Sequence, residues 1–225
     1  MCEHLAPNGL PALAPMTEAH IEDDVIGRVR NTRLSKSQSL MAIFEAVVNS
    51  IHAIEDSHHP GLIQVGIVRT AQTTIADTIL PPVLGYEVVD NGVGFTNANY
   101  KSFRTADSRL KLKRGGKGIG RFMWLKAFTN VAISSVYIEN GETRKRAFDF
   151  VAQEDPIQNI QEGLTEGEPR TTVTLSGVRP SYEGTLPATA ATLADRLTRH
   201  LLCQRASNVD QQCASKIDQG ISVFS

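Results

Sequence analysis

The chain has 225 residues, of which 41% are hydrophobic and 21% are charged, and these values are ordinary for a globular protein that buries a sizeable core. Its formal net charge of −1 gives no general affinity for nucleic acid or for an anionic membrane. The three cysteines form no C-x-x-C pair, no stretch has the form of a signal peptide, and no apolar run approaches the length of a membrane span. We therefore expect a cytoplasmic protein without a disulfide framework.

The first half of the chain is predicted to hold one long helix and two strands. Residues 1–17 contain three prolines and a glycine, which favours a flexible arm. Residues 37–56 place apolar side chains on one broad face at about 3.6 residues per turn, the pattern of the strongest helix in the chain. Residues 62–70 and 84–90 are predicted strands, and 71–82 a loop or hairpin between them.

The second half is predicted to hold a helix, a strand meander and a final helix. The predicted helix and the three strands after it cover residues 122–130, 131–140, 143–153 and 170–178. Asn140 and Gly141 are a strong hairpin signal, Trp124 is expected in the core, and a further helix follows Pro187. This order predicts an α+β fold, a two-layer α/β sandwich with helices covering one face of a mixed, mostly antiparallel sheet.

The stretch EAVVNSIHA (45–53) carries the first candidate motif. Glu45 and Asn49 are four residues apart, so both side chains leave one face of the predicted helix. A carboxylate there can take a proton from an attacking water, and the amide oxygen can ligate a hard cation such as Mg²⁺. A solvated helix face explains the same pattern, and the motif alone leaves both interpretations open.

The stretch DNGVGF (90–95) follows a predicted strand and is the second candidate motif. Asp90 can accept a hydrogen bond from an exocyclic amine such as adenine N6, and Gly92 and Gly94 allow the backbone to approach a flat ring. An ordinary turn after a strand is the alternative, because Asn-Gly is a common turn dipeptide.

The stretch GGKGIGRF (115–122) is glycine-rich and basic, and precedes an apolar helix. It is no P-loop, because Arg121 and Phe122 stand where Lys and Ser/Thr are needed, and it lacks the third glycine of a dinucleotide fingerprint. Glycines before a helix leave backbone N–H groups for phosphates, and Lys117 and Arg121 add positive charge. A glycine-rich loop that only ends a lid is the alternative.

In this order and spacing the three stretches resemble the motifs of the GHKL superfamily, which comprises DNA gyrase B, Hsp90, histidine kinases and MutL. EAVVNSIHA is similar to the N-box, DNGVGF to the first glycine box, and GGKGIGRF to the second, and the resemblance spans about residues 37–178. It implies the Bergerat ATP-binding fold, with ATP and Mg²⁺ as cofactors.

The resemblance also implies roles for single residues. Glu45 matches the general base, Asn49 the Mg²⁺ ligand, and Asp90 the aspartate that binds adenine. Thr171 is expected to reach adenine through water, although Arg170 stands where the family has glycine. The other residues expected at the nucleotide are Ala53, Gly92, Val93, Gly94, Gly116, Lys117, Gly118, Ile119, Gly120 and Arg121.

Residues 96–114 match the lid of the family and are polar and basic. The lid would fold over the triphosphate, and a solvated loop is an equally open interpretation. Its charged residues are Lys101, Arg104, Asp107, Arg109, Lys111, Lys113 and Arg114.

Glu45 favours the hydrolysing branches of the superfamily, and the closest resemblance is to bacterial Hsp90-like ATP-binding proteins, some of which are similar to stress or antiphage defence components. A histidine kinase is disfavoured, because neither His4 nor His20 is followed by H-E-x-x-x-P. The resemblance implies an ATP-binding domain at 18–180. Residues 181–225 would be a linker and the start of a transducer-like segment, so the chain is expected to be the N-terminal part of a larger ATPase.

Three hypotheses follow for the activity. The first is an ATPase whose nucleotide state gates lid closure and homodimerisation, with an unknown downstream domain or effector protein as partner. The second is a module that senses ATP or ADP without hydrolysis, and the third is a kinase that uses the same pocket. No membrane partner is expected, and the net charge does not support nucleic-acid binding by this chain.

Overall fold

The computed structural model describes residues 24–57, 60–70, 81–105, 120–207 and 221–224. Its strands are β1 (Ile63–Arg69), β2 (Val83–Asp90), β3 (Phe128–Glu139), β4 (Glu142–Phe150), β5 (Ile157–Leu164), β6 (Arg170–Val178) and β7 (Ile221–Phe224). Its helices are α1 (Val25–Asn31), α2 (Met41–Glu55), α3 (Asn97–Arg104), α4 (Gly120–Ala127) and α5 (Ala190–Ser207), with short 3-10 turns η1 (Lys36–Gln38) and η3 (Pro180–Tyr182).

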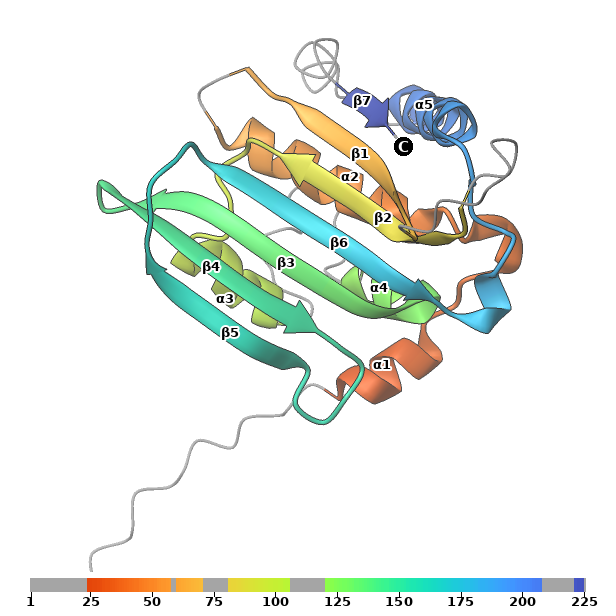
Figure 1. Ribbon diagram of the computed structural model, residues 1–225, viewed down its shortest axis with the longest axis horizontal. Helices are drawn as coiled ribbons and strands as arrows, with labels where there is room; N and C mark the ends of the chain where they lie inside the picture. The colour runs from red at the N-terminus through yellow and green to blue at the C-terminus, as the bar shows by residue number, and fades with distance from the viewer. Residues whose placement is uncertain (1–23, 58–59, 71–80, 106–119, 208–220, 225) are drawn as a thin grey trace, which may run out of the picture.

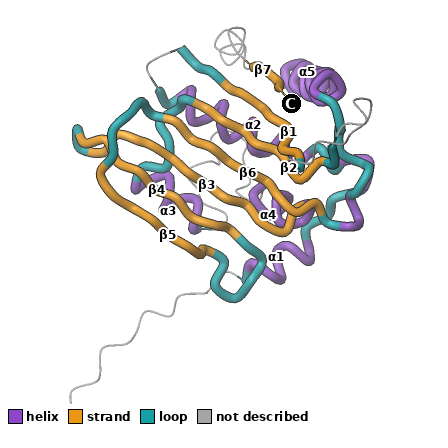
Figure 2. Tube along the Cα trace, viewed as in Figure 1, coloured by secondary structure: helices purple, strands orange, loops and turns teal. Residues whose placement is uncertain are grey.

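The described strands form one sheet in the order β5-β4-β3-β6-β2-β1-β7. Neighbouring strands pair antiparallel except β1 and β7, which are parallel. Figure 1 shows α2, α3 and α4 behind this sheet, α1 at its lower right edge and α5 beside β7, and Figure 2 shows the strands as one layer. The expected α+β class and mixed, mostly antiparallel sheet are confirmed.

The core lies between α2, α4 and the sheet face they cover. On α2, Phe44 and Val47 are 1% and 0% exposed, because its apolar side chains recur on one side of the helix. Trp124 of α4 is 2% exposed, so the prediction of a core position is confirmed. Side chains alternate between the two faces of a strand, so every second residue of a strand faces the helical layer.

Several predicted elements appear with small shifts. The strand expected at 170–178 is β6 with the same bounds, and the helix expected at 37–56 is η1 followed by α2. The hairpin between β3 and β4 is confirmed, with positive φ values of 53° at Asn140 and 81° at Gly141, as a two-residue turn of primed type requires.

One predicted helix is shorter than expected, and part of the predicted lid is helical. The helix expected at 122–130 ends at Ala127, because Phe128 already begins β3 and pairs with Val178. Residues 97–104, expected in the lid, form α3, and the Thr96 side chain caps that helix by accepting a hydrogen bond from the Asn99 N–H. The remaining lid residues, 106–114, lie outside the described residues, as does the arm predicted at 1–17.

The segment expected as a linker from 181 onward packs on the same core in its described part. The Tyr86 hydroxyl donates to the Pro187 carbonyl at 2.7 Å, and Leu193 and Leu197 of α5 are 0% and 1% exposed. Leu193 and Leu197 are four residues apart, so they lie on one side of the helix.

Strands β5 and β7 were not predicted, and β7 closes the edge of β1. No described helix is long and apolar enough to cross a membrane.

Candidate functional site

Asp90 ends β2 on the face of the sheet that meets α2. It shares this face with Tyr86 and Val88, because side chains alternate along a strand, and it is only 4% exposed. One carboxylate oxygen accepts a hydrogen bond from the Ser50 hydroxyl at 2.7 Å, and the other accepts one from the Gly92 N–H at 2.9 Å. The carboxylate is therefore fixed in orientation by α2 and by the turn that follows β2.

Burial raises the pKa of the Asp90 carboxyl from 3.8 to about 6, because an apolar surrounding disfavours the charged form. The hydrogen bonds from Ser50 and Gly92 act in the opposite direction, since they favour the carboxylate. At neutral pH the group is mostly ionised. Each carboxylate oxygen has more than one lone pair, so Asp90 retains capacity for another donor.

A row of polar side chains continues from Asp90 across the neighbouring strands. Asp90 pairs in register with Thr171 of β6, and Thr171 pairs with Ser135 of β3. Thr171 and Ser135 are 4% and 0% exposed, and their hydroxyl oxygens are 2.9 Å apart. The Thr171 expected beside adenine therefore lies next to Asp90 on the helix-facing side of the sheet.

The two glycines after Asp90 fit the turn against its surroundings. A Cβ on Gly92 would lie 2.5 Å from the Ala53 carbonyl carbon, and the Val93 N–H donates to the Ala53 oxygen at 3.1 Å. Gly94 has a φ of +73°, and a Cβ there would lie 2.6 Å from the Ser135 hydroxyl. Both glycines thus let the turn close on α2 and β3, and their contact with a flat ring stays a prediction.

Asn49 and Glu45 lie on α2 about one and two turns before Ala53, and both are half-buried. The place that a Cβ on Gly120 would take is filled by the Glu45 carboxylate. Because Gly120 is the first residue of α4, the end of the glycine-rich stretch contacts the predicted general base. A purely solvated helix face does not describe this part of α2.

Arg121 turns toward aromatic rings. It is 9% exposed, and the centre of its guanidinium lies 4.8 Å from the Phe122 ring centroid and 5.4 Å from that of Phe103. The side chain thus contributes to the contact between α3 and α4, and the contact with phosphate that the resemblance implies stays a prediction. Gly116, Lys117, Gly118 and Ile119 lie outside the described residues.

The residues around Asp90 include several that the motifs did not reveal. Ser50 lies on the apolar side of α2, four residues before Ile54, so a serine at a core position was the available signal. Ser135 sits at an inward position of β3, and only the strand register brings it to Thr171. Arg146 of β4 pairs with Ser135, and Glu162 of β5 pairs with Arg146, so the row crosses five strands.

We name the polar row by these five residues, Asp90, Thr171, Ser135, Arg146 and Glu162. At its Asp90 end, a buried carboxylate acceptor lies next to the hydroxyls of Ser50 and Thr171. This arrangement suits a planar group that carries an N–H donor at its edge. Near the other end of α2, Glu45 offers a carboxylate beside the start of α4. In the described part of the chain, no three His, Cys, Asp or Glu side chains gather into a metal site.

No protein-family model matches the chain, and a search of curated proteins finds no significant match.

Proposed function

We propose that the protein binds ATP with Mg²⁺ and hydrolyses it, as a member of the GHKL superfamily. The observation that carries the proposal is the surrounding of Asp90, a buried carboxylate held by Ser50 and Gly92 in register with Thr171. A buried carboxylate that keeps acceptor capacity costs stability, and such groups concentrate at binding sites. Its position supports a role in recognising the adenine amine.

The residues present fit a nucleotide at two further points. The position of a Cβ on Gly120 coincides with the Glu45 carboxylate, so the glycine-rich stretch enters α4 directly against this side chain. Asn49 stands one turn after Glu45 on the same face of α2. These contacts support a common site for the three motifs, which are far apart in the sequence.

Each residue has a definite chemical task in this proposal. Bound MgATP supplies the phosphoanhydride bond that is cleaved. Asp90 accepts a hydrogen bond from the amine of adenine, and Asn49 offers its amide oxygen to Mg²⁺. Glu45 orients a water molecule and accepts its proton, a contribution of about 100- to 10,000-fold to the rate.

Calorimetric titration with MgATP and MgGTP tests the binding step. We expect wild-type protein to prefer ATP, because guanine presents a carbonyl where adenine presents the amine that Asp90 accepts. Asp90→Asn should bind ATP about 10- to 100-fold more weakly, the value of a hydrogen bond to a charged group. Asp149→Asn, on the opposite face of the sheet, is the matched control and should bind normally. Absence of adenine-nucleotide binding by wild type would refute the proposal.

Phosphate release tests the hydrolytic step and separates an ATPase from a nucleotide sensor. Glu45→Gln keeps the size of the side chain and removes the base, so turnover should fall about 100-fold or more while ATP affinity persists. Glu87→Gln of β2 has its carboxyl on the other side of the strand and serves as control. Equal turnover by wild type and Glu45→Gln would exclude Glu45 as the base.

A further inference from the structure

Arg146 of β4 is a buried arginine whose guanidinium donates to three acceptors, one on β5 and two at the start of α3 and just before it. Its side chain is 4% exposed, and Nε donates to a carboxylate oxygen of Glu162 at 2.6 Å. Nη1 donates to the Phe95 carbonyl at 2.5 Å, and Nη2 donates to the Asn97 side-chain oxygen at 2.8 Å. A charge so deeply buried is stable only when its donors are satisfied, and here a planar fork meets three acceptors.

Two tyrosine rings enclose the same guanidinium. Its central carbon lies 4.4 Å from the Tyr100 ring centroid and 5.1 Å from that of Tyr137. Tyr100 belongs to α3 and Tyr137 to β3, so the cation joins the helix to the sheet.

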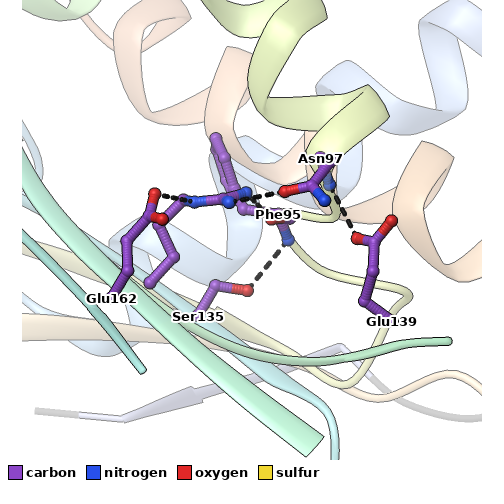
Figure 3. A network of polar contacts seen from close by, with 6 residues as sticks. Phe95, Asn97, Ser135, Glu139 and Glu162 are labelled. Carbon is purple, nitrogen blue, oxygen red and sulfur yellow. Dashed lines mark hydrogen bonds and ion pairs between the residues drawn. The ribbon is translucent and has the colours of Figure 1, made fainter. Parts of the chain in front are cut away.

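The backbone that Arg146 holds is also fixed from its other side. The Phe95 N–H donates to the Ser135 hydroxyl at 3.0 Å, and the Asn97 N–H donates to a carboxylate oxygen of Glu139 at 2.8 Å. Figure 3 marks both hydrogen bonds with dashed lines. The Asn99 side chain closes the turn by donating to the Gly94 carbonyl at 2.7 Å. We call residues 94–97 the anchored segment.

The anchored segment directly follows the turn that holds Asp90. The Phe95 N–H bonds to Ser135, whose hydroxyl contacts Thr171 next to Asp90, while the Phe95 carbonyl bonds to Arg146. The Phe95 peptide is therefore held between the middle and the far side of the polar row. Loss of either contact leaves the position of the Gly94 turn relative to Asp90 less well defined.

We propose that Arg146 is a positioning residue of the nucleotide site. It fixes the anchored segment, so that the glycine turn and Asp90 are preorganised to bind the adenine ring. The inference rests on the proposed function. Arg146 acts through the backbone of Phe95 and through Asn97. The contact between Arg146 and Asn97 also fixes the first turn of α3, where the predicted lid begins.

Arg146→Lys is the direct test, because an ammonium keeps the charge and loses the planar fork. We expect affinity for MgADP, measured by calorimetry, to fall about tenfold, the effect of one lost hydrogen bond to a charged group. The KM for ATP should rise by about the same factor while kcat stays within about twofold, because the contacts of Arg146 act on the glycine turn beside Asp90 and not on Glu45.

Hydrogen exchange of the nucleotide-free protein separates positioning from a merely structural role. In Arg146→Lys the amides of residues 95–99 should exchange about tenfold faster, while amides in the centres of β3 and β6 keep the wild-type rates. Arg144→Lys is the matched control on the same strand, since Arg144 is 40% exposed and its ion pair with Glu142 lies at the hairpin. This control should bind MgADP as wild type does.

Asn97→Ala is a second variant that keeps the proposal testable if Arg146→Lys fails to fold. It removes one of the three acceptors of the Arg146 guanidinium and leaves the Asn97 N–H bonded to Glu139. We expect about three- to fivefold weaker MgADP binding, and the double variant with Arg146→Lys should lose less than the product of the two single effects.

Each result has a defined meaning. Unchanged affinity in both Arg146→Lys and Asn97→Ala, with wild type binding MgADP, would overturn this inference alone. Faster exchange throughout the sheet together with a lower melting temperature would reduce Arg146 to a structural residue and would also overturn it. A wild-type protein that binds no adenine nucleotide would overturn the proposed function, and the inference with it.

Discussion

The Asp90 carboxyl links the proposed site to the stability of the fold. Its pKa of about 6 in the folded protein lies above the ordinary 3.8. The favourable contribution of this group to folding is therefore complete below pH 3.8 and is lost as the pH rises through 6. One pKa unit corresponds to about 1.4 kcal/mol, so ionised Asp90 costs the fold roughly 3 kcal/mol at neutral pH.

Asp90→Asn should therefore stabilise the free protein at neutral pH while it weakens nucleotide binding. The amide keeps an acceptor for the Gly92 N–H, and its NH₂ group can donate to the Ser50 hydroxyl. In urea denaturation we expect a gain of about 2 kcal/mol at pH 7.5 that falls toward zero at pH 4. A difference between variant and wild type that does not change with pH would show that Asp90 titrates normally.

Gly92→Ala should be costly for a steric reason. The new methyl group would lie 2.5 to 2.8 Å from atoms of Ala53, so the turn must move away from α2. We expect a loss of about 1–3 kcal/mol in free energy of unfolding, together with weaker ATP binding. Gly163→Ala of β5 is the matched control, because nothing lies within 4 Å of its Cβ position, and denaturation should leave its stability near that of wild type.

At the scale of elements, α3 is held to the sheet by aromatic rings. The ring centroid of Phe103 lies 5.2 Å from that of Phe150, 5.4 Å from that of Phe148, and 6.4 Å from that of Trp124. Trp124 is the only tryptophan in the chain and lies on α4, so its fluorescence reports how α3 and α4 meet.

Phe103→Ala should loosen α3 without unfolding the sheet. Because Phe103 is half-buried, we expect a loss of about 2 kcal/mol, below the range for a fully buried phenylalanine. The emission of Trp124 should shift to longer wavelength in the native protein as water reaches the ring. Phe224→Ala, whose side chain is 46% exposed on β7, should leave the emission unchanged, and an unchanged spectrum in Phe103→Ala would argue against this packing.

The sequence predicted elements with strong apolar periodicity and missed those without it. Helix α2 and strand β6 have clear patterns, whereas α3 is rich in polar and basic residues, and its signals were the Thr96 cap and the spacing of Tyr100 and Phe103. Strand β5 has mostly exposed side chains and a positive φ of 53° at Asn159, which interrupts the alternation. Strand β7 has only four residues and depends on a distant partner.

The candidate site was predicted as far as local motifs reach. Glu45, Asn49 and Asp90 stand in short stretches with distinctive spacing, but Ser135 and Arg146 belong to ordinary strands. Their proximity to Thr171 and Phe95 follows from the pairing of β3 with β4 and β6, which is long-range information. A buried arginine in a strand is rare enough to be a signal only once the inward face of that strand is known.

At the scale of the whole molecule, β7 ties residues 221–224 to the edge of β1. Val223 packs against the core and Ser222 points outward, in register with Val65 and Gln64 of β1. We expect Val223→Lys to destabilise the protein by about 1–3 kcal/mol and to promote self-association through the uncovered edge. Thermal melting and size-exclusion chromatography measure both effects. Ser222→Lys is the control, and equal behaviour of the two variants would show that β7 does not protect this edge.

The pairing of β7 with β1 also has a consequence for synthesis of the protein. Strand β1 leaves the ribosome about 150 residues before β7, which at about 5–20 residues per second is an interval of roughly 8–30 s. During that time the outer N–H and C=O groups of β1 have no final partner. The nascent chain therefore offers a β-edge beside apolar Val65 and Ile67, and a chaperone that binds extended apolar segments has its longest opportunity there.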